Sequence, residues 1–358
     1  MKQIRLIMLA ASFLTMLASL AYAQGAEAEW DALNRKVLEL RQLGKFEQAA
    51  VISQKSLEVA EQNFGPDHYT VATSLSNLAT LYQDQSDYAK AVPLYKRSLV
   101  IWEKILGPEH LAIAKSLNNL AAVYQMQGDY SSAEALHNRS LAIREKSLGP
   151  DHIDVARSLN NLAVLYYAQG NHSKAEPLLI RSLAIREKSL GGDHPDVAIS
   201  LNNLADIYQM QNDYSKAEAY YTRSLAIWEK ILGPDHPNVA TSLNNLALIS
   251  QAQGAYSNAE LLFQRALVIM EKSLGSDHNS VATSLNNLAS LYLEQGDYAK
   301  AEPLYKRSLV IWEKILGPDH PNVATSLENL VSLYRATKRE SQADALEQRM
   351  TTIRAIER

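Results

Sequence analysis

Residues 110–151 read HLAIAKSLNNLAAVYQMQGDYSSAEALHNRSLAIREKSLGPD, and close copies of this stretch follow one another along the chain. A glycine recurs every 42 residues, with a histidine three positions after it. The glycines are Gly65, Gly107, Gly149, Gly191, Gly233, Gly275 and Gly317, and the histidines are His68, His110, His152, His194, His236, His278 and His320. A fixed period of this size indicates a repeat protein, in which each unit packs only against its neighbours.

The apolar residues of this stretch form two helical stripes. Leu117, Leu120 and Tyr124 are spaced by three and four positions, as on one face of an amphipathic helix, which predicts a first helix over about 110–126. A second stripe predicts a second helix from residue 130 to about 147. Each repeat is therefore predicted to be a pair of helices.

Turn residues separate the predicted helices. Gly128 allows the backbone to turn, and Asp129 is placed to cap the second helix. Gly149 and Pro150 end that helix, since glycine suits the C-terminal cap and proline cannot continue a helix. Asp151 is then predicted to cap the first helix of the next repeat.

Small residues recur where the two helices of a repeat are expected to cross. Facing alanines let two helices approach closely, and tyrosines beside them fill the remaining space. The first helices carry Ala79, Ala121, Ala163, Ala205, Ala247 and Ala289, and the second helices carry Ala91, Ala133, Ala175, Ala217, Ala259, Ala301 and Ala343. The tyrosines are Tyr82, Tyr124, Tyr166, Tyr208, Tyr292 and Tyr334. This pattern is typical of a packed core.

The order of these residues resembles a known signature. Leu120-Ala121, Tyr124, the turn 128–130, Ala133 and Ser140 match the spacing of the tetratricopeptide repeat. The 42-residue unit, with Leu-Asn-Asn-Leu-Ala in the first helix, is similar to the kinesin-light-chain subtype. The resemblance implies an all-α, right-handed superhelical solenoid of stacked antiparallel helix pairs, with bound peptides touching the Asn positions. Nothing in the chain resembles the coiled-coil segment that joins such light chains to a motor.

The repeats and the first residues predict the domain organisation. We expect a signal peptide over 1–23, a divergent N-terminal repeat over 24–67 and a truncated C-terminal repeat over 320–358. The six close copies between them are 68–109, 110–151, 152–193, 194–235, 236–277 and 278–319. No separate globular domain is predicted.

The N-terminal segment has the three parts of a secretory signal. Lys2 and Arg5 precede an apolar stretch over 6–20, and Ala-Tyr-Ala stands directly before Gln24. We expect export to the periplasm or the medium of a bacterium, with cleavage after Ala23. An uncleaved membrane anchor is the alternative, because the stretch 6–23 is just long enough to span a bilayer. The chain has no cysteine, so disulfides cannot stabilise it after export.

Two rows of asparagine lie opposite the apolar stripe of the first helices. The Asn118 row comprises Asn118, Asn160, Asn202, Asn244 and Asn286, and the Asn77 row comprises Asn77, Asn119, Asn161, Asn203, Asn245, Asn287 and Asn329. An asparagine both donates and accepts hydrogen bonds, so a row of them can bind the backbone of an extended peptide. Bonding between neighbouring helices is the alternative use, and the Asn118 row is the one that we expect to contact a ligand.

Variation among the copies points to the selective part of this surface. The position two residues before the apolar Leu holds a cation only in two adjacent repeats, as Lys115 and Arg157. Together with Asn119 and Asn161, these cations are suited to an aspartate, a glutamate or a C-terminal carboxylate of a partner protein. A pair of solvated charges without a ligand is the alternative interpretation.

Other function classes find little support in the sequence. The net charge is −4 with both signs interspersed, which does not suit a nucleic acid. The recurring histidines are one per helix pair and therefore too far apart to share a metal ion, and no cofactor motif occurs. We predict a non-catalytic protein-interaction scaffold. A structural spacer that associates through its ends and an undetected ligand-processing protein are the alternatives, and the oligomeric state stays open.

Overall fold

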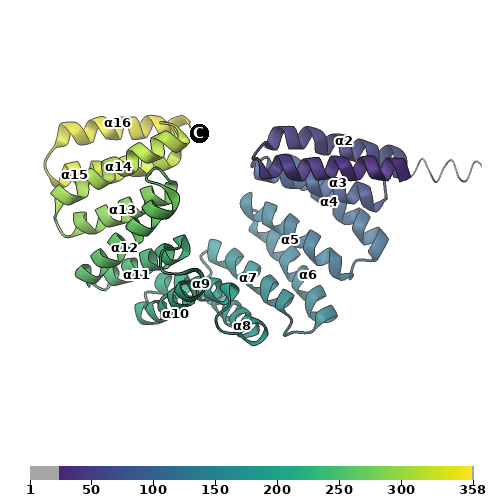
Figure 1. The fold of residues 1–358 in the computed structure, drawn as a ribbon, viewed down its shortest axis with the longest axis horizontal. Helices are drawn as coiled ribbons and strands as arrows, with labels where there is room; N and C mark the ends of the chain where they lie inside the picture. Colours follow the sequence, from purple (N-terminus) through teal and green to yellow (C-terminus); the bar gives the residue numbers. More distant parts are fainter. Residues whose placement is uncertain (1–23, 357–358) are drawn as a thin grey trace, which may run out of the picture. The chain divides into compact units, whose positions relative to one another are not determined.

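The computed structural model describes residues 24–356, which consist of helices joined by short turns, with no strand among them (Figure 1). The predicted signal peptide and its membrane-anchor alternative lie outside these residues. In the part of the chain that the structure describes, no helix is long and apolar enough to cross a membrane. The all-α fold predicted from the sequence is confirmed.

The helices fall into two compact units that meet in sequence between Asn171 and His172. The first unit contains a helix over 24–42 followed by α2 (Phe46–Phe64), α3 (Tyr69–Asp84), α4 (Tyr88–Leu106), α5 (Leu111–Met126), α6 (Tyr130–Leu148) and α7 (Ile153–Ala168). The second contains α8 (His172–Leu190), α9 (Pro195–Met210), α10 (Tyr214–Leu232), α11 (Pro237–Ala252), α12 (Tyr256–Leu274), α13 (Asn279–Glu294), α14 (Tyr298–Leu316), α15 (Pro321–Ala336) and α16 (Glu340–Ile356). Odd-numbered helices from α3 onward are the first helices of repeats, and even-numbered ones are the second helices.

The predicted ends of the helices are confirmed to within about a residue. Gly149 follows α6 with a φ of 88°, in the left-handed region that favours glycine, and its N–H donates to Glu145 O at 3.0 Å. At the start of α6, Oδ1 of Asp129 accepts from the backbone N–H of Ser132 at 3.1 Å. Both turn predictions are therefore correct for the repeat from which they were made.

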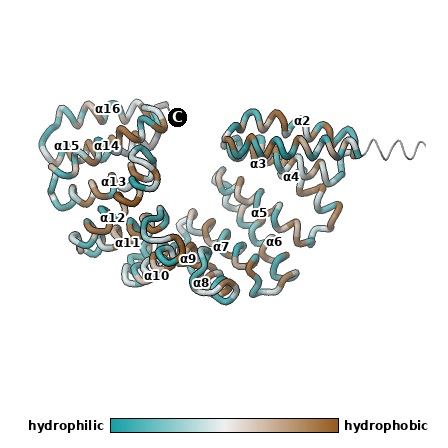
Figure 2. The backbone as a smooth tube through the Cα atoms, in the orientation of Figure 1, coloured by the Kyte–Doolittle hydropathy of each residue, from teal (hydrophilic) through white to brown (hydrophobic). Residues whose placement is uncertain are grey.

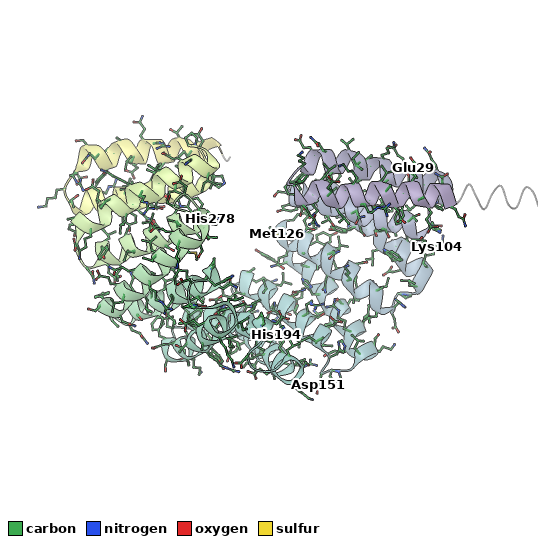
Figure 3. All side chains as sticks on the ribbon, viewed as in Figure 1. Glu29, Lys104, Met126, Asp151, His194 and His278 are labelled. Atoms are coloured by element: carbon green, nitrogen blue, oxygen red, sulfur yellow. The ribbon has the colours of Figure 1, made fainter. Side chains whose placement is uncertain are left out.

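The predicted cap at Asp151 is wrong, because the recurring histidine occupies that position. In α7 the cap is His152, whose Nδ1 accepts from the backbone N–H of Asp154 at 3.1 Å. The same bond recurs in the other first helices that the structure describes fully, at His68, His110, His194, His236 and His278. His194 and His278, which cap α9 and α13, are labelled in Figure 3. The recurring histidines are therefore the N-terminal caps of these first helices.

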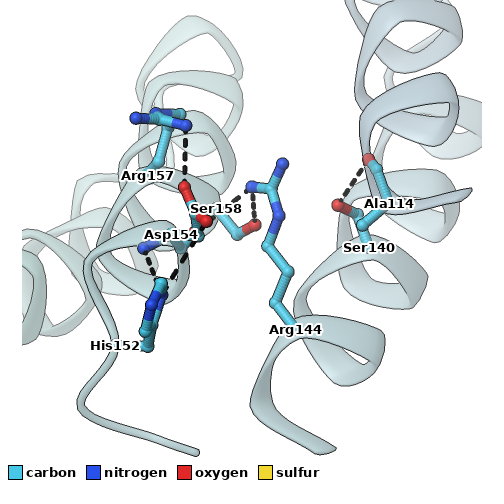
Figure 4. Close-up of polar contacts among 7 residues, drawn as sticks. All are labelled: Ala114, Ser140, Arg144, His152, Asp154, Arg157 and Ser158. Atoms are coloured by element: carbon cyan, nitrogen blue, oxygen red, sulfur yellow. Dashed lines mark hydrogen bonds and ion pairs between the residues drawn. The ribbon is translucent and has the colours of Figure 1, made fainter. Parts of the chain in front are cut away.

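The two helices of a repeat meet at small side chains. Ala121 of α5 and Ala133 of α6 are fully buried, and Ser140 Oγ of α6 donates to Ala114 O of α5 at 2.9 Å (Figure 4). Equivalent serine bonds occur from Ser98 to Ala72, from Ser224 to Ala198 and from Ser308 to Ala282. A buried hydroxyl that bonds to a helix carbonyl in this way fixes how the two helices cross.

Neighbouring repeats are joined by a different set of bonds. The hydroxyl of Tyr166 donates to Glu134 on the second helix of the preceding repeat at 2.7 Å. On the outer face Arg139 pairs with Glu103 at 2.6 Å, and this pairing recurs as Arg97–Glu61, Arg223–Glu187, Arg265–Glu229, Arg307–Glu271 and Arg349–Glu313. The recurring arginines therefore link second helices of neighbouring repeats through ion pairs. Along each helix, hydrophobic and hydrophilic residues are interspersed, as the amphipathic stripes of the sequence predict (Figure 2).

A substitution on α10 tests the close approach of the helices. Ala217 is fully buried, so Ala217→Leu should overpack its helix pair and lower the free energy of unfolding by about 1 to 3 kcal/mol. Ala226→Leu on the exposed side of the same helix is the matched control, with little expected effect. Urea unfolding gives the energies, and hydrogen exchange should rise most in α9 and α10. Equal exchange throughout the chain would contradict nearest-neighbour stabilisation.

Candidate peptide-binding surface

The first helices of unit 1 carry two adjoining hollows. The first hollow has a volume of about 570 Å³ and lies over α3, α4 and α5, where it is lined by Asn77, Tyr95, Trp102, Lys115 and Asn119 among others. Its walls carry the hydroxyls of Thr73, Ser76, Thr80 and Ser116. This hollow therefore combines aromatic side chains with polar groups.

The second hollow has a volume of about 400 Å³ and lies over α5, α6 and α7. It shares Lys115 and Asn119 with the first, so the two hollows adjoin. Its lining consists of Leu111, Lys115, Asn118, Asn119, Arg144, Asp154, Arg157 and Asn161. The structure thus brings together five of the residues that we predict to bind a peptide, on one surface of unit 1.

The two predicted cations differ in their surroundings. Lys115 is exposed and makes neither a hydrogen bond nor an ion pair with the residues that the structure describes. Arg157 is also exposed, but its Nη1 pairs with Asp154 Oδ1 at 2.8 Å on the same helix (Figure 4). Lys115 is therefore free to meet a ligand, whereas Arg157 already has an acidic partner.

A third cation, which the sequence analysis missed, lies in the wall of the second hollow. Arg144 of α6 is only 7% exposed, and its Nη1 donates to Ser158 Oγ at 2.6 Å and to Asp154 O at 3.2 Å (Figure 4). Burial lowers the pKa of this guanidinium. The signal in the sequence is that this position holds Arg144 and, in the next repeat, Arg186. The other copies have Trp102, Trp228, Met270 and Trp312 there.

Asn118 connects this arginine to a buried histidine. The side-chain amide of Asn118 lies 3.0 Å from His137 Nδ1. With the amide nitrogen facing the histidine, Asn118 donates to His137 Nδ1 at 3.0 Å and to Ser140 Oγ at 3.2 Å. Its oxygen then accepts from Nη1 and Nη2 of Arg144 at 3.1 and 3.2 Å. Burial, together with the charge of Arg144, lowers the pKa of His137 to about 4. Asn118 therefore holds the arginine in place from within the repeat.

Other members of the Asn118 row also bond within their unit. Asn244 departs from the expectation of a groove-facing side chain, because it is 8% exposed and donates to Ser284 Oγ of the next repeat at 3.1 Å. Asn286 accepts from Asn329 Nδ2 at 2.7 Å. A helical wheel underestimates such burial because a first helix touches both its own second helix and the next repeat. Bonding between repeats, the alternative use of the rows, is thus observed at these positions.

The remaining asparagines are half-buried and leave the ligand prediction open. They are Asn119, Asn160, Asn161, Asn202, Asn203, Asn245 and Asn287. At Asn202 the buried Oδ1 accepts no hydrogen bond from the described residues. Contact of these side chains with a peptide stays a prediction.

One acidic residue in unit 2 also escaped the sequence analysis. Asp206 of α9 is half-buried and accepts from the hydroxyl of Tyr221, and burial raises the pKa of its carboxyl. Thr80, Ala122, Val164 and Leu248 stand at the equivalent position elsewhere, so this acid is specific to one repeat. Tyr221 also donates to Gln209 at 3.1 Å. The three side chains form a hydrogen-bonded group in unit 2.

Comparison with known families agrees with the helix pairs and their period. The model of the tetratricopeptide repeat matches residues 32–99, 70–146, 133–188, 154–230, 216–272, 243–309 and 280–355. The chain belongs to the tetratricopeptide repeat family. No curated protein matches it.

Solved structures of tetratricopeptide repeat proteins resemble the chain over much of its length. BtubC (BKLC) from P. vanneervenii is 26% identical over 63% of this chain and 91% of its own, with a TM-score of 0.55. A putative kinesin light chain from Podospora anserina is 31% identical over 58% of this chain and 99% of its own, with a TM-score of 0.51. The quorum sensor NprR from B. thuringiensis is 15% identical over 90% and 87%, with a TM-score of 0.66, and shares the fold alone. The similarity to the kinesin-light-chain type is confirmed.

The buried histidine is expected to make the stability of unit 1 sensitive to acid. The pKa of His137 is about 4 in the folded state and near 6.5 in an unfolded chain. Between pH 4 and pH 6.5 the unfolded state therefore binds the proton more readily than the folded state does. Stability should be full above about pH 6.5 and fall by about 3 kcal/mol as the pH drops to about 4. His137→Leu, which copies Leu179 of the next repeat, should remove this part of the pH dependence. Urea unfolding of both proteins at several pH values measures it, and parallel curves would contradict the assignment.

Proposed function

We propose that the protein is a non-catalytic interaction scaffold that binds an extended segment of a partner protein on the first-helix surface of unit 1. The observation that carries this proposal is the second hollow, in which Lys115, Arg157 and three asparagines meet. None of these side chains belongs to the fully buried core. Their position on one concave surface is what a peptide site requires.

The chemistry of the two hollows fits different parts of a peptide. Asn119 and Asn161 supply donors and acceptors for a peptide backbone, and Lys115 and Arg157 supply positive charge for an acidic side chain. The first hollow places Tyr95 and Trp102 beside hydroxyl groups, which suits an apolar side chain of the same peptide. The partner is therefore an acidic polypeptide segment with an apolar residue nearby.

Paired variants test this site. Replacing Asn119 and Asn161 by Ala should weaken binding of the partner by about 1 to 3 kcal/mol, because polar groups of the bound backbone lose their hydrogen bonds. Asn138→Ala, on the exposed side of α6, is the matched control and should leave affinity unchanged. The partner is first isolated with the purified protein from the native extract, and affinity is then measured by calorimetry. An unfolded double variant would show that these asparagines are structural.

Charge reversal addresses selectivity separately. Changing Lys115 and Arg157 to Glu should change which proteins are retained, and wild-type binding of an acidic partner should weaken as salt rises. Mass spectrometry of the retained proteins gives the comparison. An unchanged set of proteins would exclude these two cations as selective residues.

We further propose that the protein is exported and loses its first 23 residues. The charged start, the apolar stretch and Ala-Tyr-Ala before Gln24 support this proposal. N-terminal sequencing of protein from the native source should begin at Gln24. A native protein that starts at Met1 and sediments with membranes would favour the anchor instead.

A further inference from the structure

Asp206 of α9 carries a negative charge for which its surroundings in unit 2 supply no cation. The carboxylate is half-buried, and its Oδ1 accepts from the hydroxyl of Tyr221 on α10. It forms no ion pair with the residues that the structure describes, and neither α9 nor α11 contains a lysine or an arginine. The cations of α10 are paired elsewhere, Lys216 with Asp213, Arg223 with Glu187 and Lys230 with Asp193. A half-buried carboxylate is solvated less well than an exposed one, so a cation supplied by a ligand would stabilise it.

Packing does not require a charge at this position. In the repeat of α3, Thr80 Oγ1 lies 2.8 Å from the hydroxyl of Tyr95. In the repeat of α13, Ser290 forms a hydrogen bond with Tyr305. Both tyrosines are equivalent to the one that bonds to Asp206. A neutral hydroxyl can therefore satisfy the tyrosine, and the carboxylate adds a charge that the fold does not need.

The same face of α9 carries a second acceptor and two apolar side chains. Asn202 precedes Asp206 by four residues, so the two side chains lie about 6 Å apart on one face of the helix. The buried Oδ1 of Asn202 accepts no hydrogen bond from the described residues. Ile199 and Met210, which lie on this face as well, are 42% and 56% exposed. The face thus offers oxygen acceptors beside apolar surface.

A ligand for this face must donate hydrogen bonds and carry positive charge. A lysine ammonium has three donors and no acceptor, and its methylene groups suit the exposed apolar side chains. An arginine is less suitable, because its planar fork pairs best with both oxygens of a carboxylate and Tyr221 already occupies Oδ1 of Asp206. The geometry and the charge therefore both favour a lysine.

We propose that α9 binds a lysine side chain of a polypeptide partner, with Asp206 as its counter-ion and Asn202 as a second acceptor. This site lies in unit 2 and takes a charge opposite to that of the ligand proposed for unit 1. Neighbouring repeats carry Val164 and Leu248 at the position of Asp206, so the site is confined to one repeat. One first helix thereby distinguishes a basic residue from an apolar one.

Substitutions taken from the array itself remove the charge and keep a partner for the tyrosine. Asp206→Thr and Asp206→Ser copy Thr80 and Ser290, which occupy the same position in other repeats. Each leaves a hydroxyl that is expected to accept from Tyr221, as in those repeats. Asp344→Thr is the matched control, since it makes the same change of charge on the exposed side of α16 in the same unit. Thermal unfolding should show that all three variants fold.

The probes are blocked alanine-based peptides with a central lysine or a central norleucine, and n-butylamine as an ammonium without a peptide. Norleucine keeps the length and the apolar character of the lysine stem but has no charge. NMR-detected titration of the full chain at low ionic strength should show the tightest binding for the lysine peptide, and this binding should weaken as salt rises. Both Asp206 variants should weaken it by about 10-fold, because a charged hydrogen bond is lost, and Asp344→Thr should not change it.

Three results would overturn the lysine site. They are no binding of the lysine peptide, equal affinity for the lysine and norleucine peptides, and unchanged affinity in both Asp206 variants. If butylamine binds as tightly as the lysine peptide, a small amine is the ligand and the assignment to a polypeptide is wrong. Should the Asp206 variants fail to fold, the comparison of lysine with norleucine in the wild type still decides whether the charge is recognised. The acidic partner proposed for unit 1 is independent of all these outcomes.

Discussion

The close approach of the two helices within a repeat is the contact on which the other features depend. In the repeat of α5 and α6, each helix carries a fully buried alanine, and the hydroxyl of Ser140 bonds to a carbonyl of α5. Arg144 follows Ser140 by one helical turn, so the position of its guanidinium is set by this crossing. The packing of small residues thus determines where a side chain of the second hollow lies.

Stability and recognition use different positions of the same repeat. Positions that hold the helices together carry the same residue in most copies, as in the buried serines and alanines and the ion pairs of the outer face. Each exposed ion pair contributes less than about 1 kcal/mol, and the buried contacts dominate the stability. Positions 115, 144, 157 and 206 vary among the copies, because packing tolerates different side chains there. This freedom lets some repeats carry a charge that others lack.

Much of the fold follows from local rules that a sequence reveals. The ends of α5 and α6 were predictable because glycine and aspartate act on the residues next to them. The first-helix cap was assigned to Asp151 instead of His152, since aspartate is the commoner cap and the histidine bond depends on the conformation at one residue. Five residues of the second hollow were predicted from exposure on a single helix. Arg144 and the burial of Asn244 were missed because both depend on contacts between helices, which a helical wheel does not contain.

Site-specific photocrosslinking tests most directly whether the first-helix surface of unit 1 is the binding surface. A benzoylphenylalanine is placed at position 112, which is exposed in the lining of the first hollow, or at position 142, which is exposed beside Arg139 on α6. A labelled peptide that carries the acidic segment of the isolated partner is then added to each protein, and the mixture is irradiated. Our account predicts a crosslinked product from position 112 that excess unlabelled peptide abolishes, and little product from position 142. Crosslinking from position 142 alone would contradict it, because the peptide would then lie outside the two hollows.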